Sequence, residues 1–533
     1  MATRNKMCAV PYRTMLLLVV SGGGLSALDG VQGRSGMVST AHPVATEAGV
    51  EILKRGGNAF DAAVAVAATL NVVEPENSGM GGYGLILIYD ASKRQVWVLN
   101  ASGRIPRTVN PEVFRAPAPG YIENRKGAKS VVPPVNLRAW EELSRGYGAL
   151  AWKDLLVSAI RAADDGIVLD RAIPQEAFDG FPSHAKEFYG KGAKPLQAGE
   201  RLIKKDLARS LRAVAGGGAR VLHGGPLGRS IEAEMIRAGG FLRLADLAES
   251  RAEWWEPLEI DYRGYRVVTA SPPANSFTAL VRLGIMSQFD VRGLGHNTVE
   301  YLHRFIEVTK HGEWCRVAYA GDPDVKAPPL SRLLSGAYWS EHAAKVGQET
   351  THFAVADSKG NVVTATQTIG QAFGSRVMAP GTGIWLNNSL CYSTFEPQGN
   401  PMDVHPGRRK LNSNTPVLVM RNGLPWIAIG AAGGHTIPQT VPQAVMNMVD
   451  FGLDIQQALA ASRVAFEAPD QLSVETGLGD AVLSEFEKRG HRVKVMERGI
   501  GRLHGLSIEY EGGGPVRYLG GVDPRGRGLA KGL

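Results

Sequence analysis

The chain has 533 residues, enough for one large buried core or for about three domains of average size. Hydrophobic residues make up 44% and charged residues 21%, which excludes a disordered or fibrous protein. The formal net charge is +8, but no dense basic block indicates a nucleic acid as partner. No apolar run reaches the roughly 18 residues of a membrane span. We therefore expect a globular protein, and its ordinary composition favours an enzyme.

The three cysteines are too few and too far apart to define a site. Cys8, Cys315 and Cys391 cannot all pair with one another, and their spacing matches no metal-binding pattern. We accordingly expect neither a disulfide framework nor a metal, and no other cofactor is indicated.

Residues 1–36 differ in composition from the rest of the chain. Arg4, Lys6 and Arg13 precede an apolar run at 15–20, a pattern typical of a secretory signal. The glycines at 22–24 weaken the apolar segment, so a disordered leader or a misplaced start is the alternative. We expect a periplasmic or secreted protein if the leader is a signal, and a cytoplasmic one otherwise.

The segment after the leader predicts two helices and a hairpin. Helical spacing runs from 45 to 54 and stops at a glycine pair. Asn58 then caps a second helix over 59–70, which is too rich in Ala and Val to face water. Two strands at 85–89 and 95–99 follow and form a largely buried hairpin.

The middle of the chain is predicted to be mainly helical. Residues 137–250 form helices separated by Gly and Pro, and a strand pair follows at 258–262 and 265–269. Helices resume between 277 and 320. The segment 330–349 is predicted to be poorly anchored polar chain.

A second hairpin carries two threonines to one of its ends. Its strands are predicted at 351–356 and 361–369. If Asp357 pairs with Asn361 and Gly360 is left-handed, Thr350 lies opposite Thr368. By itself this is weak evidence for chemistry, because most threonines in such places only favour the strand.

The hairpin sequence from 350 to 374 resembles the signature of the γ-glutamyltransferases, which are N-terminal-nucleophile hydrolases. The resemblance covers nearly the whole chain from Met37. The matching segments follow one another in the order found in the family, which makes the resemblance highly specific. They are 39–43, 56–62, 78–82, 321–323, 380–383, 387–388, 433–434 and 523–525.

The resemblance implies an α+β fold, a four-layer αββα sandwich made as an inactive precursor. Such a chain would cut its own Glu349–Thr350 bond when the Thr350 hydroxyl attacks the Glu349 carbonyl carbon. The large fragment, 37–349, and the small fragment, 350–533, would remain together as a heterodimer. The freed Thr350 amine has an ordinary pKa of about 7.7–8.0, so nucleophile and general base share one residue.

The resemblance also implies catalytic roles for three further residues. Thr368 matches the threonine that hydrogen-bonds the nucleophile. Gly433 and Gly434 follow a strand and precede a helix, where their backbone N–H groups can stabilise an oxyanion. The alternative for the glycine pair is close packing.

The substrate contacts are partly kept and partly replaced. Arg104 matches the arginine that binds the substrate α-carboxylate, a task suited to its bidentate guanidinium, although a plain surface arginine is the alternative. Asn412 and Ser413 take the place of a serine pair that holds the same group. By contrast, the three positions that bind the α-ammonium in the family carry no suitable side chain here, and they are Gly370, Ser389 and Tyr392. The loop between 388 and 412 is also short, which suggests an open site.

These features leave three functional hypotheses. The default is transfer of a γ-glutamyl group from a glutathione-like amide to water or an amine. The close alternative is an amidohydrolase or acylase for a carboxylate-bearing acyl group without the α-amine, oxamate-like or glutaryl-like. The remote alternative is a non-catalytic exported binding protein, which would have no reason to keep Thr350, Thr368 and the glycine pair together.

Overall fold

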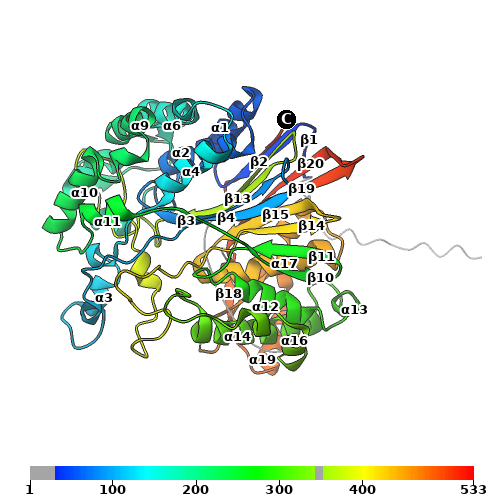
Figure 1. The fold of residues 1–533 in the computed structure, drawn as a ribbon. Helices are drawn as coiled ribbons and strands as arrows, with labels where there is room; N and C mark the ends of the chain where they lie inside the picture. Colours follow the sequence, from blue (N-terminus) through cyan, green and yellow to red (C-terminus); the bar gives the residue numbers. More distant parts are fainter. Residues whose placement is uncertain (1–29, 343–351, 468, 498) are drawn as a thin grey trace, which may run out of the picture.

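The computed structural model describes residues 30–342, 352–467, 469–497 and 499–533. Two seven-stranded sheets lie face to face, and helices cover both outer faces (Figure 1). This is the expected four-layer αββα sandwich. Residues 1–29 of the predicted leader, including Cys8, and the Glu349–Thr350 bond lie outside the described residues, whereas residues 30–36 are described and include β1 (Val31–Gly33).

The first sheet contains the hairpin with the family signature at its centre. All neighbouring strands run antiparallel. Their order is β21 (Leu529–Gly532), β2 (Gly36–Thr40), β12 (Phe353–Asp357), β13 (Val362–Thr368), β3 (Tyr83–Asp90), β4 (Gln95–Ala101) and β9 (Glu253–Trp255).

The second sheet is also antiparallel throughout. Its order is β1 (Val31–Gly33), β20 (Gly514–Val522), β19 (Arg502–Glu511), β15 (Leu424–Ala432), β14 (Val417–Arg421), β11 (Tyr265–Thr269) and β10 (Leu258–Tyr262). Apolar side chains from both sheets fill the space between them, among them Leu87, Val268, Leu418 and Leu506. The predicted strand pair at 258–269 is confirmed with the same bounds.

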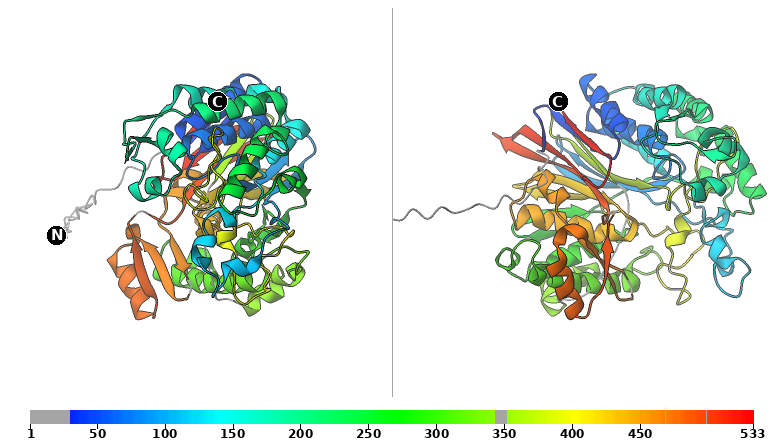
Figure 2. Two further views of the ribbon diagram at one scale, coloured as in Figure 1. Left: turned by 90° about the vertical axis from the view of Figure 1, so that its left-hand side faces the viewer. Right: turned by 180° about the vertical axis from the view of Figure 1, so that it is seen from behind.

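Each sheet has its own helical layer (Figure 2). The helices on the side of the first sheet include α1 (Pro43–Lys54), α2 (Ala59–Val73), α4 (Asn136–Tyr147), α6 (Val157–Asp165) and α9 (Lys205–Gly217). Those on the second include α12 (Phe277–Met286), α14 (Val299–Tyr319), α17 (Ile437–Val449) and α18 (Ile455–Ala460). Every residue of α2 is buried and Asn58 caps it, as the sequence predicts, and Asp61 completes the capping box.

Shorter elements complete the described chain. The helices are α3 (Tyr121–Asn124), α5 (Trp152–Leu155), α7 (Gln175–Asp179), α8 (Ser183–Tyr189), α10 (Pro226–Arg237), α11 (Leu244–Glu249), α13 (Val291–Leu294), α15 (Leu330–Leu333), α16 (Gly336–Glu341) and α19 (Asp480–Lys488). The strands are β5 (Ile167–Val168), β6 (Gly190–Lys191), β7 (Lys194–Pro195), β8 (Arg201–Leu202), β16 (Val464–Glu467), β17 (Gln471–Glu475) and β18 (Arg492–Met496). Strands β16–β18 and helix α19 form what we call the C-terminal lobe, at the edge of the molecule (Figure 2).

The predicted register of the β12–β13 hairpin is confirmed. Phe353 pairs with Ala365 and Ala356 with Val362, and Gly360 has a left-handed φ of +81°. Asp357 fixes the turn by accepting the Asn361 N–H, and its other carboxylate oxygen accepts the Ala59 N–H at the start of α2. The turn is thereby attached to the helical layer.

The prediction for 330–349 is wrong as far as residue 341. This segment forms α15 and α16, which pack on the second sheet's helices. Tyr338 is 3% exposed, and its hydroxyl lies 2.9 Å from His311 Nε2. The Trp339 ring lies so close to Gly284 of α12 that a Cβ there would be 2.1 Å from it. These partners are distant in sequence, so the local pattern did not reveal the anchoring.

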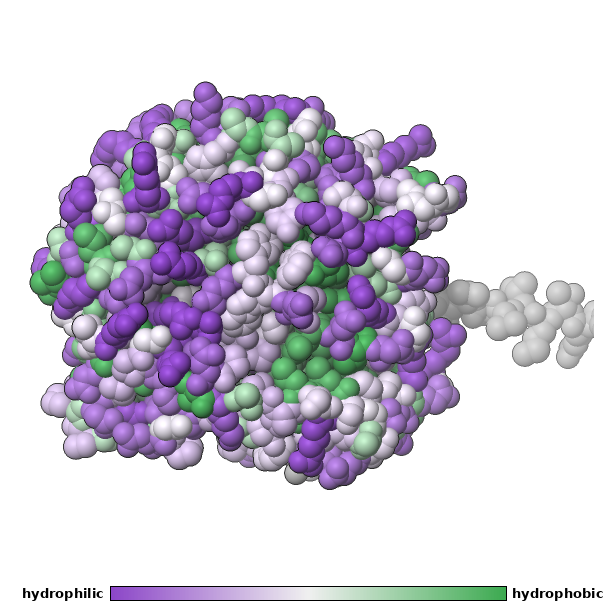
Figure 3. Space-filling view, viewed as in Figure 1, coloured by the Kyte–Doolittle hydropathy of each residue, from purple (hydrophilic) through white to green (hydrophobic). Residues whose placement is uncertain are grey.

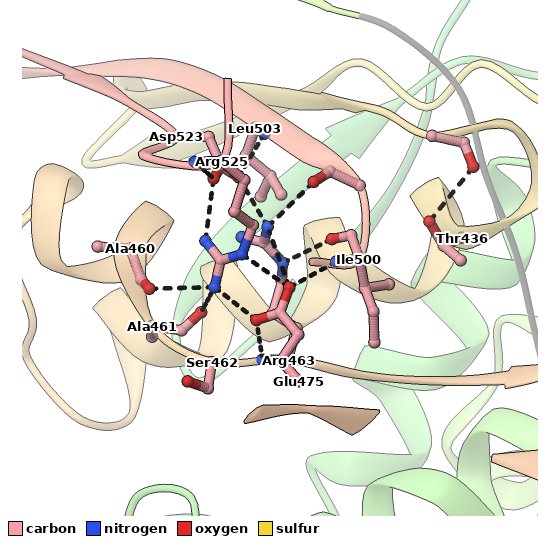
Figure 4. A network of polar contacts seen from close by, with 12 residues as sticks. Thr436, Ala460, Ala461, Ser462, Arg463, Glu475, Ile500, Leu503, Asp523 and Arg525 are labelled. Carbon is pink, nitrogen blue, oxygen red and sulfur yellow. Dashed lines mark hydrogen bonds and ion pairs between the residues drawn. The ribbon is translucent and has the colours of Figure 1, made fainter. Parts of the chain in front are cut away.

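The motif at 523–525 holds the C-terminal strands in place through a buried network of ion pairs (Figure 4). Asp523 accepts hydrogen bonds from Arg463 at 2.7 Å and from the Leu503 N–H at 2.8 Å. Arg525 pairs with Asp523 at 2.9 Å and with Glu475, and it also donates to the Ala461 carbonyl. The motif therefore joins β19 and β20 to α18 and β17.

The surface is mostly polar on the face that Figure 3 shows. Hydrophilic side chains cover most of this face, and apolar ones gather in one area toward its lower right. Among the helices of the described residues, none is both long and apolar enough to cross a membrane.

Candidate active site

Thr368 ends β13 and turns the chain through Gly370. The Thr368 hydroxyl oxygen accepts the Gly370 N–H at 2.9 Å, and the Gly370 carbonyl lies 3.3 Å away. Thr368 is 2% exposed. The hydroxyl itself donates to that carbonyl, so Thr368 can offer a hydrogen bond to another oxygen only by turning its O–H away from Gly370.

Gly370 sits where no side chain fits. Its φ is +98°, and a Cβ on it would lie 2.1 Å from the Asn388 side-chain oxygen. Asn388 is fixed by accepting the Gln371 N–H at 2.9 Å and by donating to the Gln371 side chain at 3.0 Å. The position is therefore closed to larger residues unless Asn388 moves.

The loop after Asn388 is equally well anchored. Asn387 donates to the Gly81 and Val132 carbonyls, each at 2.9 Å, and accepts the Ser389 N–H. Ser389 is fully buried and begins a short helical turn that ends at Tyr392. Asn388 thus links this loop to Gly370, and the two uncharged side chains of Ser389 and Tyr392 follow it directly.

Gly433 and Gly434 lie between the end of β15 and the start of α17. Both have positive φ, 145° and 61°, which glycine adopts without strain. The next residue, His435, packs its ring edge to face with Tyr392 at 5.5 Å. The structure therefore brings the glycine pair and Tyr392 together beside a helix N-terminus, a place suited to negative charge.

Asn412 and Ser413 adjoin the same region. Asn412 donates to the Ser102 hydroxyl at 3.1 Å, and the next residue but one, Asn414, donates to the Thr366 carbonyl at 2.7 Å. Ser413 is 8% exposed, and its hydroxyl has no hydrogen-bond partner among the described residues. A buried hydroxyl without a partner is costly unless a ligand or water satisfies it.

Arg104 lies further out, in a polar cavity of about 170 Å³. Its guanidinium is 44% exposed and pairs with Glu253 at 3.0 Å, and Glu253 also pairs with Arg409 at 2.8 Å. Backbone pairing between 103–105 and 407–410 places Arg104 near the Asn412 segment. Arg104 is accessible to a carboxylate, which would share it with Glu253.

His352 is a residue near the site that the sequence analysis did not single out. It is 1% exposed, with Nδ1 2.9 Å from the Thr366 hydroxyl and Nε2 2.8 Å from that of Thr364. Its ring fills the space over Gly430, where a Cβ would lie 2.3 Å from Nδ1. Burial, with His504 nearby, lowers the pKa of His352 well below its ordinary value. A neutral ring therefore links the two sheets close to the start of β12.

Lys410 is a second residue that sequence reasoning missed. It is 1% exposed, its ammonium donates to the Leu411 carbonyl at 2.9 Å, and no carboxylate of the described residues pairs with it. Burial lowers the pKa of Lys410 to about 7. Burial, with Arg316 and Lys410 nearby, likewise lowers the pKa of His435 to about 3. The ring beside the glycine pair is therefore neutral and faces a cationic neighbourhood.

A larger, mainly apolar cavity of about 400 Å³ lies next to the loop after Gly370. Ala372 and Phe373 from that loop line it, together with Arg502 and Arg527. It contains none of the predicted site residues, so the chemistry is assigned to the polar region around Thr368.

The structure thus gathers Thr368, Gly370, the 387–392 loop, the 412–414 segment and the glycine pair around one end of the sandwich. Arg104 is joined to this group through Ser102 rather than by direct contact. Thr350 and Glu349 lie outside the described residues.

Known proteins resemble this chain over most of its length. The family described as gamma-glutamyltranspeptidase matches residues 45–533. The chain is 30% identical to a glutathione hydrolase proenzyme of Bacillus subtilis, covering 94% of this chain and 92% of that one. It is 33% identical to an acylase ACY 1 proenzyme of a Pseudomonas species, covering 92% and 95%.

Solved structures show the same likeness. A cephalosporin acylase from Bacillus halodurans has a TM-score of 0.88 at 30% identity and covers 97% of this chain and 99% of that one. A Helicobacter pylori γ-glutamyltranspeptidase structure has a TM-score of 0.53 at 29% identity, over 57% of this chain and 89% of that one. The family match spans most of the chain, both relatives cover more than nine-tenths of it, and the fold agrees. The chain belongs to the γ-glutamyltranspeptidase family.

Proposed function

We propose that this protein is a self-processing amidohydrolase whose nucleophile is Thr350 and whose acyl substrate carries a carboxylate but no α-ammonium. The observation that carries the specificity is Gly370, where a side chain would collide with Asn388 at 2.1 Å. Family membership and relatives that are proenzymes support the precursor, and one of those relatives is an acylase.

In the proposed reaction the Thr350 amine takes the proton from the Thr350 hydroxyl as the oxygen attacks the amide carbonyl. Backbone N–H groups of Gly433 and Gly434 stabilise the resulting oxyanion, and Thr368 donates a hydrogen bond to the nucleophile. The proton passes to the leaving amine, and an ester on Thr350 remains. Water, or a second amine, then attacks this ester and releases the acyl group.

The charges around the site support a substrate that has no α-ammonium group. Ser389 and Tyr392 are uncharged, and the buried Lys410 adds positive charge near His435 and Cys391. Burying an unpaired ammonium in such surroundings would cost several kcal/mol after relaxation. Arg104 and Ser413 would hold the carboxylate, since a guanidinium binds it bidentately.

The second candidate is hydrolysis or transfer of a γ-glutamyl group. It is favoured by the relatives that are glutathione hydrolases and by the retained Arg104. A comparison of two anilides distinguishes the candidates, because γ-glutamyl anilide differs from glutaryl anilide only in the amine. We expect the glutaryl compound to be hydrolysed at least as well, and Arg104→Ala to slow both. A γ-glutamyl preference of about a hundredfold, or about 2.7 kcal/mol, would instead establish the second candidate.

Self-processing has its own test. A denaturing gel should show two fragments, with the smaller beginning at Thr350, while Thr350→Ala should remain one chain. Any other N-terminus on the small fragment would refute the assignment of the nucleophile.

We also propose export, on the basis of the leader composition. The mature chain should begin within residues 28–37. Finding Met1 intact on cytosolic protein from the native host would contradict this.

A further inference from the structure

A cluster of metal-binding side chains lies far from the proposed catalytic site. His303 and Glu307 occupy successive turns of α14, so both face the same side of the helix. His491 precedes β18 in the C-terminal lobe. One potential ligand atom from each of the three residues lies within 4.8 Å of the other two.

We propose that His303, Glu307 and His491 bind a divalent transition-metal ion, preferably Zn²⁺, that fastens the C-terminal lobe to α14. Two imidazole nitrogens and one carboxylate are a ligand set that Zn²⁺ accepts, with water in the fourth position. The same set lacks the several oxygen ligands that Ca²⁺ and Mg²⁺ prefer.

The two rings are already placed for a shared ion. His303 Nδ1 and His491 Nε2 are 2.9 Å apart, slightly less than the roughly 3.3 Å edge of a tetrahedron with Zn–N bonds of about 2.0–2.1 Å. The two rings need to move apart only slightly to admit the ion. Phe486 packs its ring edge to face with His491 at 5.8 Å and so helps to fix its orientation.

The lobe is already oriented toward this face of α14. Arg489, two residues before His491, pairs with Glu300 at 2.6 Å, one turn before His303. Helix α14 also contacts β16 and α19 directly. The ion would therefore join surfaces that already meet, with little reorganisation of the backbone.

Neighbouring cations set a limit on affinity. Lys310 pairs with Glu307 through Oε1, so the ion would use Oε2, and Arg304 and Arg489 also lie near His303. Glu300 and Glu485 partly balance Arg489. His491 is 7% exposed, whereas His303 and Glu307 are half-buried, which leaves a route for the ion from solvent.

The ion would have a defined topological role. Helix α14 belongs to the proposed large fragment, and the lobe belongs to the small one. If the chain is cut at Glu349–Thr350, the ion links the two pieces. Metal binding itself does not depend on that cut or on the proposed reaction.

The test uses full-length enzyme without a histidine tag, stripped by a chelator and then dialysed against Zn²⁺. We expect one Zn²⁺ per chain by elemental analysis, and saturable binding by calorimetry. The double variant His303→Gln/His491→Gln should lose this Zn²⁺ binding. His184→Gln should retain it, because that half-buried histidine lies 2.7 Å from the Met378 carbonyl, away from the cluster. Equal binding by the wild type and the double variant, or none by the wild type at about 100 µM Zn²⁺, would overturn the proposal.

A second measurement is independent of how well the double variant folds. Glu307→Gln keeps both rings and should weaken Zn²⁺ binding. At a hundredfold excess over Kd, Zn²⁺ should raise the Tm of the wild type by about 2 °C. The double variant should show no such rise, and Mg²⁺ should produce none in either protein. A Zn²⁺ shift of equal size in the double variant would place the ion elsewhere.

Discussion

Two buried polar clusters in this molecule differ in how completely their groups are paired. In the network of Arg463, Glu475, Asp523 and Arg525, each charged group meets an opposite charge or a backbone partner. In a second group near the candidate site, made up of Lys410, Ser413 and His435, the Ser413 hydroxyl and His435 Nδ1 have no hydrogen-bond partner among the described residues. Lys410 there has a carbonyl as partner but no carboxylate.

The difference separates polar groups that stabilise the fold from polar groups available to a ligand. A fully satisfied buried network rigidifies its surroundings and leaves no group free for a ligand. Unsatisfied buried atoms cost free energy unless water or a ligand pairs with them, so those beside the candidate site are available to a substrate. Substitutions in the first cluster should therefore change stability alone, whereas substitutions in the second should change how the enzyme handles its substrate, whatever they do to stability.

The largest expected effect is the loss of stability in Asp523→Asn. Removing one charge leaves Arg463, which is 1% exposed, without its partner at 2.7 Å. Such uncompensated buried charges cost about 3–5 kcal/mol. Urea unfolding should show this loss, and kcat of the remaining folded enzyme should be unchanged.

The matched control for this variant is Asp470→Asn, whose carboxylate is exposed and 3.6 Å from Arg492. It should change stability by no more than about 0.5 kcal/mol.

The dependence of stability on acid pH offers a further check. The arginines hold the pKa of Asp523 below its ordinary value, so its contribution is present above about pH 4 and lost as pH falls. The difference in unfolding free energy between the wild type and Asp523→Asn should therefore become smaller as the pH falls. A gap that widens in acid would contradict the role of the charge.

Lys410→Met should act in the opposite direction and stabilise the protein. A pKa lowered from 10.5 to about 7 corresponds to at most about 5 kcal/mol of destabilisation below pH 7. After the loss of one hydrogen bond and some packing, we expect a gain of about 2 kcal/mol at pH 6. The unfolded chain binds the extra proton between pH 7 and 10, so wild-type stability rises over that range. The gain should therefore vanish at about pH 8.5 and become a loss of about 2 kcal/mol by about pH 10.

Lys204→Met is the control, because Lys204 is also buried, its pKa is also lowered to about 7, and it donates to the Val72 carbonyl. Both variants should show the same dependence of stability on pH. Only Lys410→Met should also reduce the preference for glutaryl over γ-glutamyl anilide. An equal change of preference in Lys204→Met would remove Lys410 from the site.

Ser413→Ala has the smallest expected effect. Its hydroxyl makes no hydrogen bond within the described part of the chain, so unfolding free energy should change by no more than about 0.5 kcal/mol. In contrast, kcat/KM for a carboxylate-bearing anilide should fall about tenfold, or about 1.4 kcal/mol. Ser210→Ala is the opposite case, since Ser210 donates to the Thr382 carbonyl at 2.7 Å. It should lose about 1 kcal/mol of stability with activity unchanged.

The sequence predicted the elements whose information is local. The β12–β13 register follows from a four-residue turn that Asp357 and Gly360 define, and α2 follows from its cap and its apolar composition. The anchoring of α16 was missed because it depends on His311 and Gly284, which are distant along the chain.

The candidate site was predictable only where a motif carried it. Thr368, Asn412, Ser413 and the glycine pair were found by resemblance, and the structure places them in one region. Lys410 stands between an arginine and a leucine and has the pattern of a surface residue, so only the folded structure reveals its burial. The partnership of His303 with His491 spans 188 residues and has no local signal.

The order of strands has a consequence for how such an enzyme must be made. A cut before Thr350 would leave β2 from the first piece paired on both sides with β12 and β21 from the second. In the other sheet, β11 of the first piece pairs with β14 of the second. Either piece synthesised alone would expose open strand edges, which invite aggregation. Folding must then precede cleavage, and two separately expressed pieces should fail to assemble into the active enzyme.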